Sequence, residues 1–296
     1  MAKIIIYFTL VEYASLIEPF ETVLRIFFSI ITTFIAFALS LFAALYAIRY
    51  KENREIKQVA HEFMFYLGIH KKAIEQQTTL SRGYFDELVS MDSFISPIIQ
   101  RTTFPIMLIE SSPKNKFIEY FRREKHEHVE AAISVMVSIN LAIEMIERYE
   151  RQCIKFSENV NEIADSWNSN ISKVHDAIRE THASLPESFD GSVEDKTLDF
   201  ILRQYQNWVT SKSKGLLSVL DLFIFPVDEK LREVIQSEPN NKYADILMKV
   251  LQSQHIIHNQ FISLKEQQEN YINRYTEQLE EQKMKLENFL SSIQIK

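Results

Sequence analysis

The histidines are the side chains best suited to binding a metal, and their spacing gives little support for a site. His255 and His258 are three residues apart, so on a helix they share one face, which is how a metal site can begin. No Glu-x-x-His repeat or His-Glu-x-x-His motif completes it. His126 and His128 lie in the charged stretch EKHEHVE, where solvated or hydrogen-bonded histidines are the common case. We therefore predict no metal and no cofactor.

The single cysteine, Cys153, is the remaining candidate for covalent chemistry. It falls on a row of apolar residues at helical spacing, so a small buried hydrophobic role is favoured over a catalytic nucleophile. The chain contains no Gly-x-Ser-x-Gly motif, and its carboxylates lie at helical distances from Lys or Arg, where they favour solubility. One cysteine forms no internal disulfide, as is usual in a reducing compartment. We therefore assign no catalytic residue and predict no enzymatic activity.

The strongest signal is an apolar run at residues 26–48, which contains no charge, Pro or Gly. At about 1.5 Å per residue this helix is about 34 Å long. A bilayer hydrocarbon core is about 30 Å thick, so the run is long enough to cross it with modest tilt. We predict that it is the only transmembrane helix.

Small and weakly polar residues recur along this run in alternating steps of four and three. They therefore share one helical face, opposite a bulky apolar surface. Small side chains let membrane helices approach closely, so the stripe favours packing against another copy of the chain. Two alternatives remain: a chance alignment of common membrane residues, or the lining of a narrow pore in a ring of copies. The stripe comprises Ser29, Thr33, Ala36, Ser40, Ala43 and Ala47.

Basic residues flank the run unequally. One precedes it closely, and four follow it within ten positions. By the positive-inside rule, the long C-terminal part is cytoplasmic and the short N-terminal part is outside, which indicates a bacterial-type inner-membrane protein. These flanking residues are Arg25, Arg49, Lys51, Arg54 and Lys57.

The rest of the chain divides by composition into four further segments. Residues 1–25 are predicted to be a short extracytoplasmic or interfacial segment with a bend at Pro19. Residues 49–91 are predicted to be a stalk that continues the membrane helix, followed by a short helix capped by Ser81. Residues 92–113 form a Pro-rich apolar connector, expected to pack inside the helical domain rather than on a partner or bilayer.

Residues 114–296 are predicted to be a long helical hairpin with coiled-coil character. The absence of Pro and Gly between Pro113 and Pro186 indicates one helix ending near residue 183. A loop at 184–197 and an apolar, buried segment at 215–227 follow, and the last helix runs from about 242 to 292.

Composition agrees with an all-α class. The whole chain has only 4 Gly and 7 Pro, and it lacks the Gly-rich loops of nucleotide-binding folds. Its net charge of −7 argues against broad nucleic-acid binding. The predicted class is all-α, with a single transmembrane helix continuing into a long-helix, coiled-coil-like cytoplasmic domain.

The predicted function is non-enzymatic. We expect a homo-oligomeric membrane effector, channel-like in its sharpest form, in which the cytoplasmic helices sense a signal ligand or protein and act through the packed spans. A self-contained antiviral defence system would need such an effector. The alternative is a membrane-tethered coiled-coil scaffold that recruits a cytoplasmic protein. No resemblance to a known family emerges from the residues.

Overall fold

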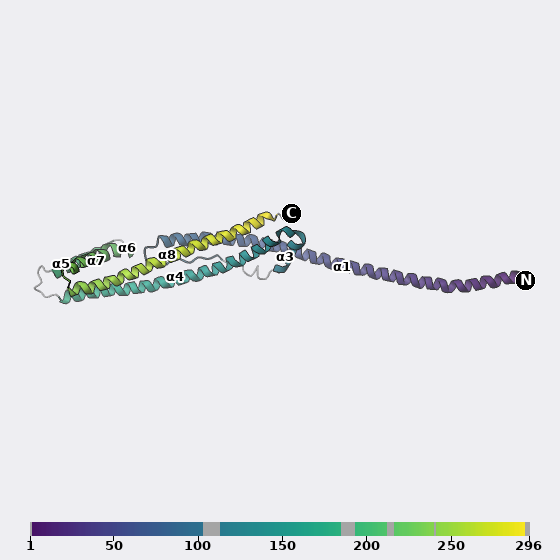
Figure 1. Ribbon diagram of the computed structural model, residues 1–296, viewed down its shortest axis with the longest axis horizontal. Coiled ribbons are helices and arrows are strands. Elements are labelled where there is room, and N and C mark those ends of the chain that lie inside the picture. Colours follow the sequence, from purple (N-terminus) through teal and green to yellow (C-terminus); the bar gives the residue numbers. More distant parts are fainter. Residues whose placement is uncertain (1, 103–112, 185–192, 212–215, 240, 294–296) are drawn as a thin grey trace. The chain divides into compact units, whose positions relative to one another are not determined.

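The computed structural model describes residues 2–102, 113–184, 193–211, 216–239 and 241–293. Within these ranges the regular structure is helical and includes no strand, so the predicted all-α class is confirmed. The elements are α1 (Ala2–Val89), α3 (Lys114–Glu124), the 3₁₀ turn η1 (His126–His128), α4 (Val129–Ser184), α5 (Val193–Thr210), α6 (Leu216–Val219), the π-helix η2 (Leu220–Ile224), α7 (Phe225–Ser237) and α8 (Lys242–Ser292) (Figure 1).

The helices divide into two compact units, and α1 contributes to both. The first unit comprises residues 1–64 and 112–127, and the second comprises residues 65–111 and 128–296.

Helix α1 has no break at Ser81, so the prediction of a separate short helix capped there is wrong. The Ser81 hydroxyl lies 3.0 Å from the Thr78 carbonyl oxygen inside the same helix and 3.0 Å from the Thr276 hydroxyl of α8. A serine bonded in this way is compatible with a helix interior. Helix α1 also continues through Pro19. The placement of residues 2–25 at a membrane interface stays a prediction.

In the first unit, α3 packs on the part of α1 that follows residue 48. The rings of Phe63 and Phe117 have centroids 4.1 Å apart, and Phe117 and Phe121 are fully buried. Three apolar residues of α1 at helical spacing, Ile56, Ala60 and Phe63, are buried as well. The apolar face of α3 thus covers one face of α1.

In the second unit, α8 runs antiparallel to the C-terminal part of α1. Lys71 pairs with Glu287 at 2.9 Å, Lys283 with Glu75 at 3.0 Å, and Lys265 Nζ donates to the carbonyl oxygen of Val89 at 2.8 Å. As residue numbers rise along α1, those of the partners on α8 fall. The described polar contacts therefore fix both the direction and the register of the two helices.

Helices α4 and α8 lie side by side over much of their length (Figure 1). Tyr149 stacks on Tyr275 with ring centroids 4.6 Å apart, and Asn170 donates to Gln254 at 2.6 Å. The pair is therefore antiparallel. Nine side chains of α4, spaced three, four or seven residues apart, are buried: Ile139, Ile146, Tyr149, Cys153, Phe156, Val160, Trp167, Val174 and Ile178.

The prediction of one helix from residue 113 to residue 183 is wrong. Helix α3 ends at Glu124, where Lys125 leaves the helical backbone with φ −147° and ψ 62°. Its N–H still donates to the Phe121 carbonyl oxygen, and α4 begins only at Val129, after η1. No Pro or Gly marks this break, so nothing in the local composition shows it.

The C-terminal helices agree better with the predictions. Helix α8 has the expected bounds, and the Asn241 side chain caps its start by accepting from the Ala244 N–H at 3.0 Å. In the described part of the apolar segment 215–227, Leu220, Phe223 and Ile224 are buried, whereas Leu222 and Phe225 are partly exposed. Of the predicted hairpin loop at 184–197, residues 185–192 lie outside the described residues, and the prediction is wrong for residues 193–197, because α5 already begins at Val193.

The connector 92–113 is described only to residue 102, and its packing is mixed. Phe94 packs between Trp167 and Phe261, with ring centroids 5.5 and 4.9 Å away. Ile95 and Ile98, in contrast, are 77% and 75% exposed. The expected inward packing therefore holds for only part of the segment.

Candidate functional site

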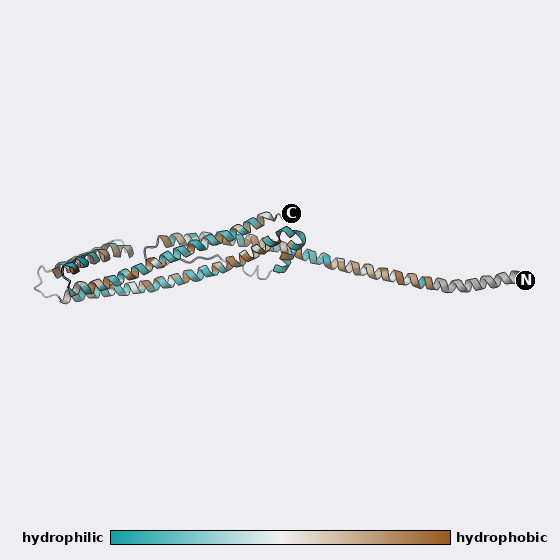
Figure 2. Ribbon diagram, in the orientation of Figure 1, coloured by the Kyte–Doolittle hydropathy of each residue, from teal (hydrophilic) through white to brown (hydrophobic). Residues whose placement is uncertain are grey.

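The largest uncovered apolar surface in the described chain belongs to α1 at residues 23–48. Nearly every side chain of this stretch is exposed, including Phe34 at 71% and Phe42 at 71%. Its most apolar part has a mean hydropathy of 2.3, and none of it is buried. Figure 2 shows this run as the brown part of α1. No described part of the chain covers it.

A second helix is also long and apolar enough to cross a membrane, judged by length and composition alone. It is α4, whose most apolar stretch has a mean hydropathy of 1.8 and is 39% buried. In the first turns of α4, Ala132, Val135 and Ile139 are fully or almost fully buried. The two helices therefore differ in surroundings more than in composition.

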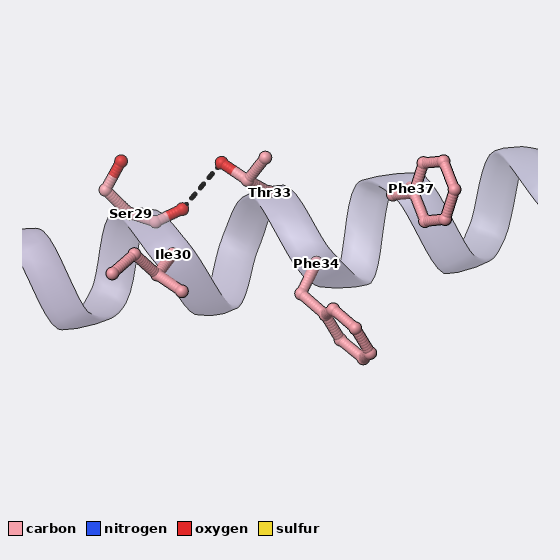
Figure 3. Close-up of a pocket in the computed structure, with 5 residues that line it drawn as sticks. All are labelled: Ser29, Ile30, Thr33, Phe34 and Phe37. Atoms are coloured by element: carbon pink, nitrogen blue, oxygen red, sulfur yellow. Dashed lines mark hydrogen bonds between the residues drawn. The ribbon is translucent and has the colours of Figure 1, made fainter.

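The hydroxyls of the small-residue stripe bond mainly to their own helix. Thr33 Oγ1 donates to the Ser29 carbonyl oxygen at 2.7 Å, and Ser40 Oγ donates to the Phe37 carbonyl oxygen at 2.8 Å. Figure 3 shows the first of these bonds, with Ser29 and Thr33 on one side of α1 and Phe34 on the other. Because these donors are satisfied internally, an apolar environment can surround the stripe at little cost.

All six residues of the stripe are exposed and lie on one helix, as their spacing predicted. A shallow groove beside the stripe is lined by Ser29, Ile30, Thr33, Phe34 and Phe37 (Figure 3). No second element of the described chain closes this groove, so within one chain it forms no enclosed ligand site.

The basic residues after the run belong partly to a network with α3. Lys57 pairs with Glu124 at 3.1 Å, and Lys116 of α3 pairs with Glu55 at 3.0 Å. Arg123 donates to Glu52 at 2.9 Å and to Asn53 at 2.8 Å. Sequence reasoning missed this arrangement because α3 lies far from residue 57 in the chain. The five predicted flank residues, Arg25, Arg49, Lys51, Arg54 and Lys57, are all exposed.

These ion pairs shift the pKa values of their members in the expected directions. The Lys116 hydrogen bond and charge lower the pKa of Glu55. Hydrogen bonds to Glu52 and Glu119 raise the pKa of Arg123. All of these side chains reach solvent, so each pair adds little to stability.

The histidines do not assemble a metal site in the described part of the chain. His255 Nε2 lies 3.8 Å from Asp228 Oδ2, and its ring stacks on Phe225. Burial, with the nearby His255, lowers the pKa of His258. The described residues contain no group of three or more His, Cys, Asp or Glu side chains able to hold a metal.

Cys153 lies in a buried polar centre between α1, α4 and α8. Gln268 Nε2 donates to its sulfur at 3.5 Å, and the ring of Tyr84 meets that of Tyr149 edge to face. Burial raises the pKa of Cys153 to about 11 and also raises the pKa of Tyr84 and Tyr149. A buried thiol with a raised pKa is a poor nucleophile, which supports the structural interpretation of Cys153.

Sequence reasoning missed most of this polar centre. Gln77 Oε1 accepts from the Thr102 N–H at 2.8 Å, and both Gln77 and Gln268 are buried. Glutamine is usually a surface residue, so its type gives no signal. The positions of Gln77 and Gln268 on otherwise inward-facing rows were the available clue.

Comparisons with known proteins assign no relationship: no family model, no curated protein and no solved structure matches the chain.

Proposed function

We propose that the protein is a single-pass membrane protein that crosses the bilayer at residues 26–48 and works as a homo-oligomer. The observation that supports this most directly is the exposure of the apolar surface of α1 on all sides. Large side chains contribute most of it: Ile26, Phe27, Phe28, Ile30, Phe34, Ile35, Phe37, Leu39, Leu41, Phe42 and Leu45.

The magnitude makes a water-exposed α1 untenable. Burying one such side chain stabilises by about 1.5–3 kcal/mol, so leaving these residues in water forgoes on the order of 20 kcal/mol. A whole domain is usually stable by only about 5–15 kcal/mol. A bilayer can cover the entire circumference of the helix, whereas a protein partner on one face would leave the apolar side chains of the other faces exposed to water.

We assign the single span to α1 and not to α4. One face of α4 is packed within the second unit, where Asn170 contacts Gln254 and Tyr149 contacts Tyr275. Moving α4 into lipid would break these contacts. The basic flank after residue 48 favours an inside location for the C-terminal helices and an outside location for the N-terminus.

The simplest role for the stripe from Ser29 to Ala47 is to pack against the same stripe of another copy of the chain. Each chain supplies one span, and satisfied hydroxyls and small side chains let two such faces approach closely. The C-terminal helices then act as the part that receives a signal ligand or protein, and the packed spans act as the effector or channel. Participation in antiviral defence stays a prediction, which survival of infected cells with and without the gene would check.

Two measurements test the proposal. Extraction of membranes with alkaline carbonate tests the span, and the mass of the full-length protein in detergent tests self-association. We expect the protein to stay in the membrane pellet and to purify as an oligomer. Changing Ser29, Thr33 and Ser40 to Leu should yield smaller particles, whereas Phe27, Phe34 and Phe42 changed to Leu on the opposite face should not. Release by carbonate would refute the span, and a wild-type monomer would refute self-association.

The scaffold alternative is supported by the exposed apolar side chains outside the span, such as Ile95 and Ile98, which suit a protein partner. Replacing residues 26–48 with an unrelated poly-Leu helix separates the two functions. A scaffold keeps its activity after this replacement, and an effector that acts through its span loses it.

A further inference from the structure

The junction between the apolar run and α3 carries an excess of positive charge. Residues 49–64 and 113–124 contain eight basic and five acidic side chains, in a chain whose net charge is −7. The acidic side chains are Glu52, Glu55, Glu62, Glu119 and Glu124, and the basic ones are Arg49, Lys51, Arg54, Lys57, Lys114, Lys116, Arg122 and Arg123.

The acidic side chains of this junction are already engaged. Arg123 bonds Glu52 and Glu119, Lys116 bonds Glu55, and Lys57 bonds Glu124. Glu62 accepts from Gln58. Within the described residues, this leaves three exposed arginines without an ion pair: Arg49, Arg54 and Arg122. The excess charge therefore faces outward, where a negative partner can reach it.

Arg49 and the end of α3 lie on the same side of α1. Arg49 precedes Asn53, which Arg123 of α3 contacts, by four residues, and a spacing of four keeps nearly the same helical face. The last turn of α3 reaches this level, because Arg123 contacts Glu52 and Asn53. Arg122 is its neighbour in that turn.

The position of the last turn of α3 relative to the bilayer follows from helix geometry. Glu52 is four residues past Ile48, or about 6 Å along the axis at about 1.5 Å per residue. The headgroup layer outside the hydrocarbon core is about 5–8 Å thick on each side of a bilayer. With residues 26–48 in the core, the last turn of α3 sits at the level of the lipid phosphates.

We propose that Arg49 and Arg122 bind the phosphate of an anionic phospholipid, so that α3 is held on the membrane surface. This proposal rests on the proposed span at residues 26–48. The guanidinium group suits bidentate recognition of phosphate oxygens. Basic residues in the last turn of a helix also stabilise its C-terminus, so the test must separate the two roles.

The experiment is native mass spectrometry of full-length protein in detergent, titrated with phosphatidylglycerol or phosphatidylcholine. We expect tighter binding of phosphatidylglycerol. Changing Arg49 and Arg122 together to Gln should weaken it about 25-fold, or about fivefold per arginine. The matched control is Lys114→Gln, which removes one charge at the opposite end of α3 and should leave lipid affinity unchanged.

Three results would overturn the proposal: equal affinity for the two lipids, an equal loss in Lys114→Gln, or full displacement of the lipid by inorganic phosphate at the same concentration. The last would indicate a site for soluble anions. If Arg122→Gln loosens α3, two other variants test the lipid site. Arg49→Gln removes a charge outside α3, and Arg122→Lys keeps the charge within it.

Carbonate extraction distinguishes this failure from failure of the proposed span. A protein released by carbonate overturns both, since no headgroup then lies beside α3. A protein that stays in the membrane but shows no lipid preference overturns the headgroup site alone.

Discussion

Residues 23–48 of α1 and the first turns of α4 are both apolar helical stretches, but they have opposite surroundings. In α1, Phe37 is 63% exposed, and its neighbours are exposed too except for the half-buried Ala38. In α4, Val137 is 61% exposed, yet Val135 and Ile139 beside it are buried within the second unit. The two helices have similar hydropathy, but they differ in how burial is distributed around the helix axis.

The largest effect should come from charges placed on matched exposed positions of the two helices. Phe34→Arg with Phe37→Arg should abolish membrane integration, because each arginine at the centre of a span costs about 2.5–3.5 kcal/mol. Ile133→Arg with Val137→Arg, on the exposed side of α4, should leave integration intact. Carbonate extraction measures both, and loss of integration in the α4 variant would show that α4 also enters the membrane.

The second prediction contrasts two phenylalanines. Phe117→Ala should destabilise the docking of α3 by about 3–5 kcal/mol, because Phe117 is fully buried against Phe63. Hydrogen exchange of the amides at residues 114–124 reports this loss. Phe42→Ala, in the exposed apolar run, is the control and should not change that exchange. Similar protection in wild type and Phe117→Ala would contradict the packing.

The third prediction concerns pH. Burial lowers the pKa of His70 from 6.5 to about 4. Between these values the unfolded chain binds a proton that the folded chain does not, so stability is complete above pH 6.5 and falls by about 3 kcal/mol as pH drops toward 4. Denaturation of the protein in detergent at several pH values measures this slope.

The matched variants for this prediction are His70→Gln and His61→Gln. The first should flatten the slope below pH 6.5, leaving a smaller slope from His258, whose pKa is also lowered. The second removes an exposed histidine of the same helix and should keep the slope. If the pH dependence of stability stayed unchanged in His70→Gln, a group other than His70 would cause it.

The smallest effect is expected for the exposed ion pairs of the first unit. Lys116→Gln removes the partner of Glu55 at 3.0 Å, and the loss of stability should be small because both side chains reach solvent. Thermal unfolding at low and high salt measures it, and salt should reduce the difference further. A much larger loss would mean that charge, and not the Phe63–Phe117 contact, holds α3.

Periodic apolar spacing predicted α8 well, because the three-four pattern acts locally, and the cap by Asn241 is a finding of the structure. The break between α3 and α4 was not predictable in this way. From Phe121 to Ala132 is eleven residues, or close to three helical turns, so the apolar phase continues across the break. The pattern is the same for one helix as for two.

The candidate site was predictable in a similarly uneven way. The spacing of Ser29, Thr33 and Ser40 placed the stripe on one face, because a single helix fixes its own geometry. The partners of Lys57 and Arg123 were not predictable, since they depend on which helix packs against which. The buried Gln77 and Gln268 were missed for the same reason.

The π-helix η2 has a consequence for insertions and deletions. Its wide turn joins the Phe225 N–H to the Leu220 carbonyl oxygen, five residues back, which accommodates one residue more than an α-helical turn. Deleting Asp221 would therefore restore an ordinary turn and keep α7 in register, whereas a one-residue deletion inside an α-helical stretch rotates everything after it by about 100°. The buried side chains Val227, Leu231 and Val234 would then still face the core, so a single-codon deletion here should be far less harmful than one inside α7.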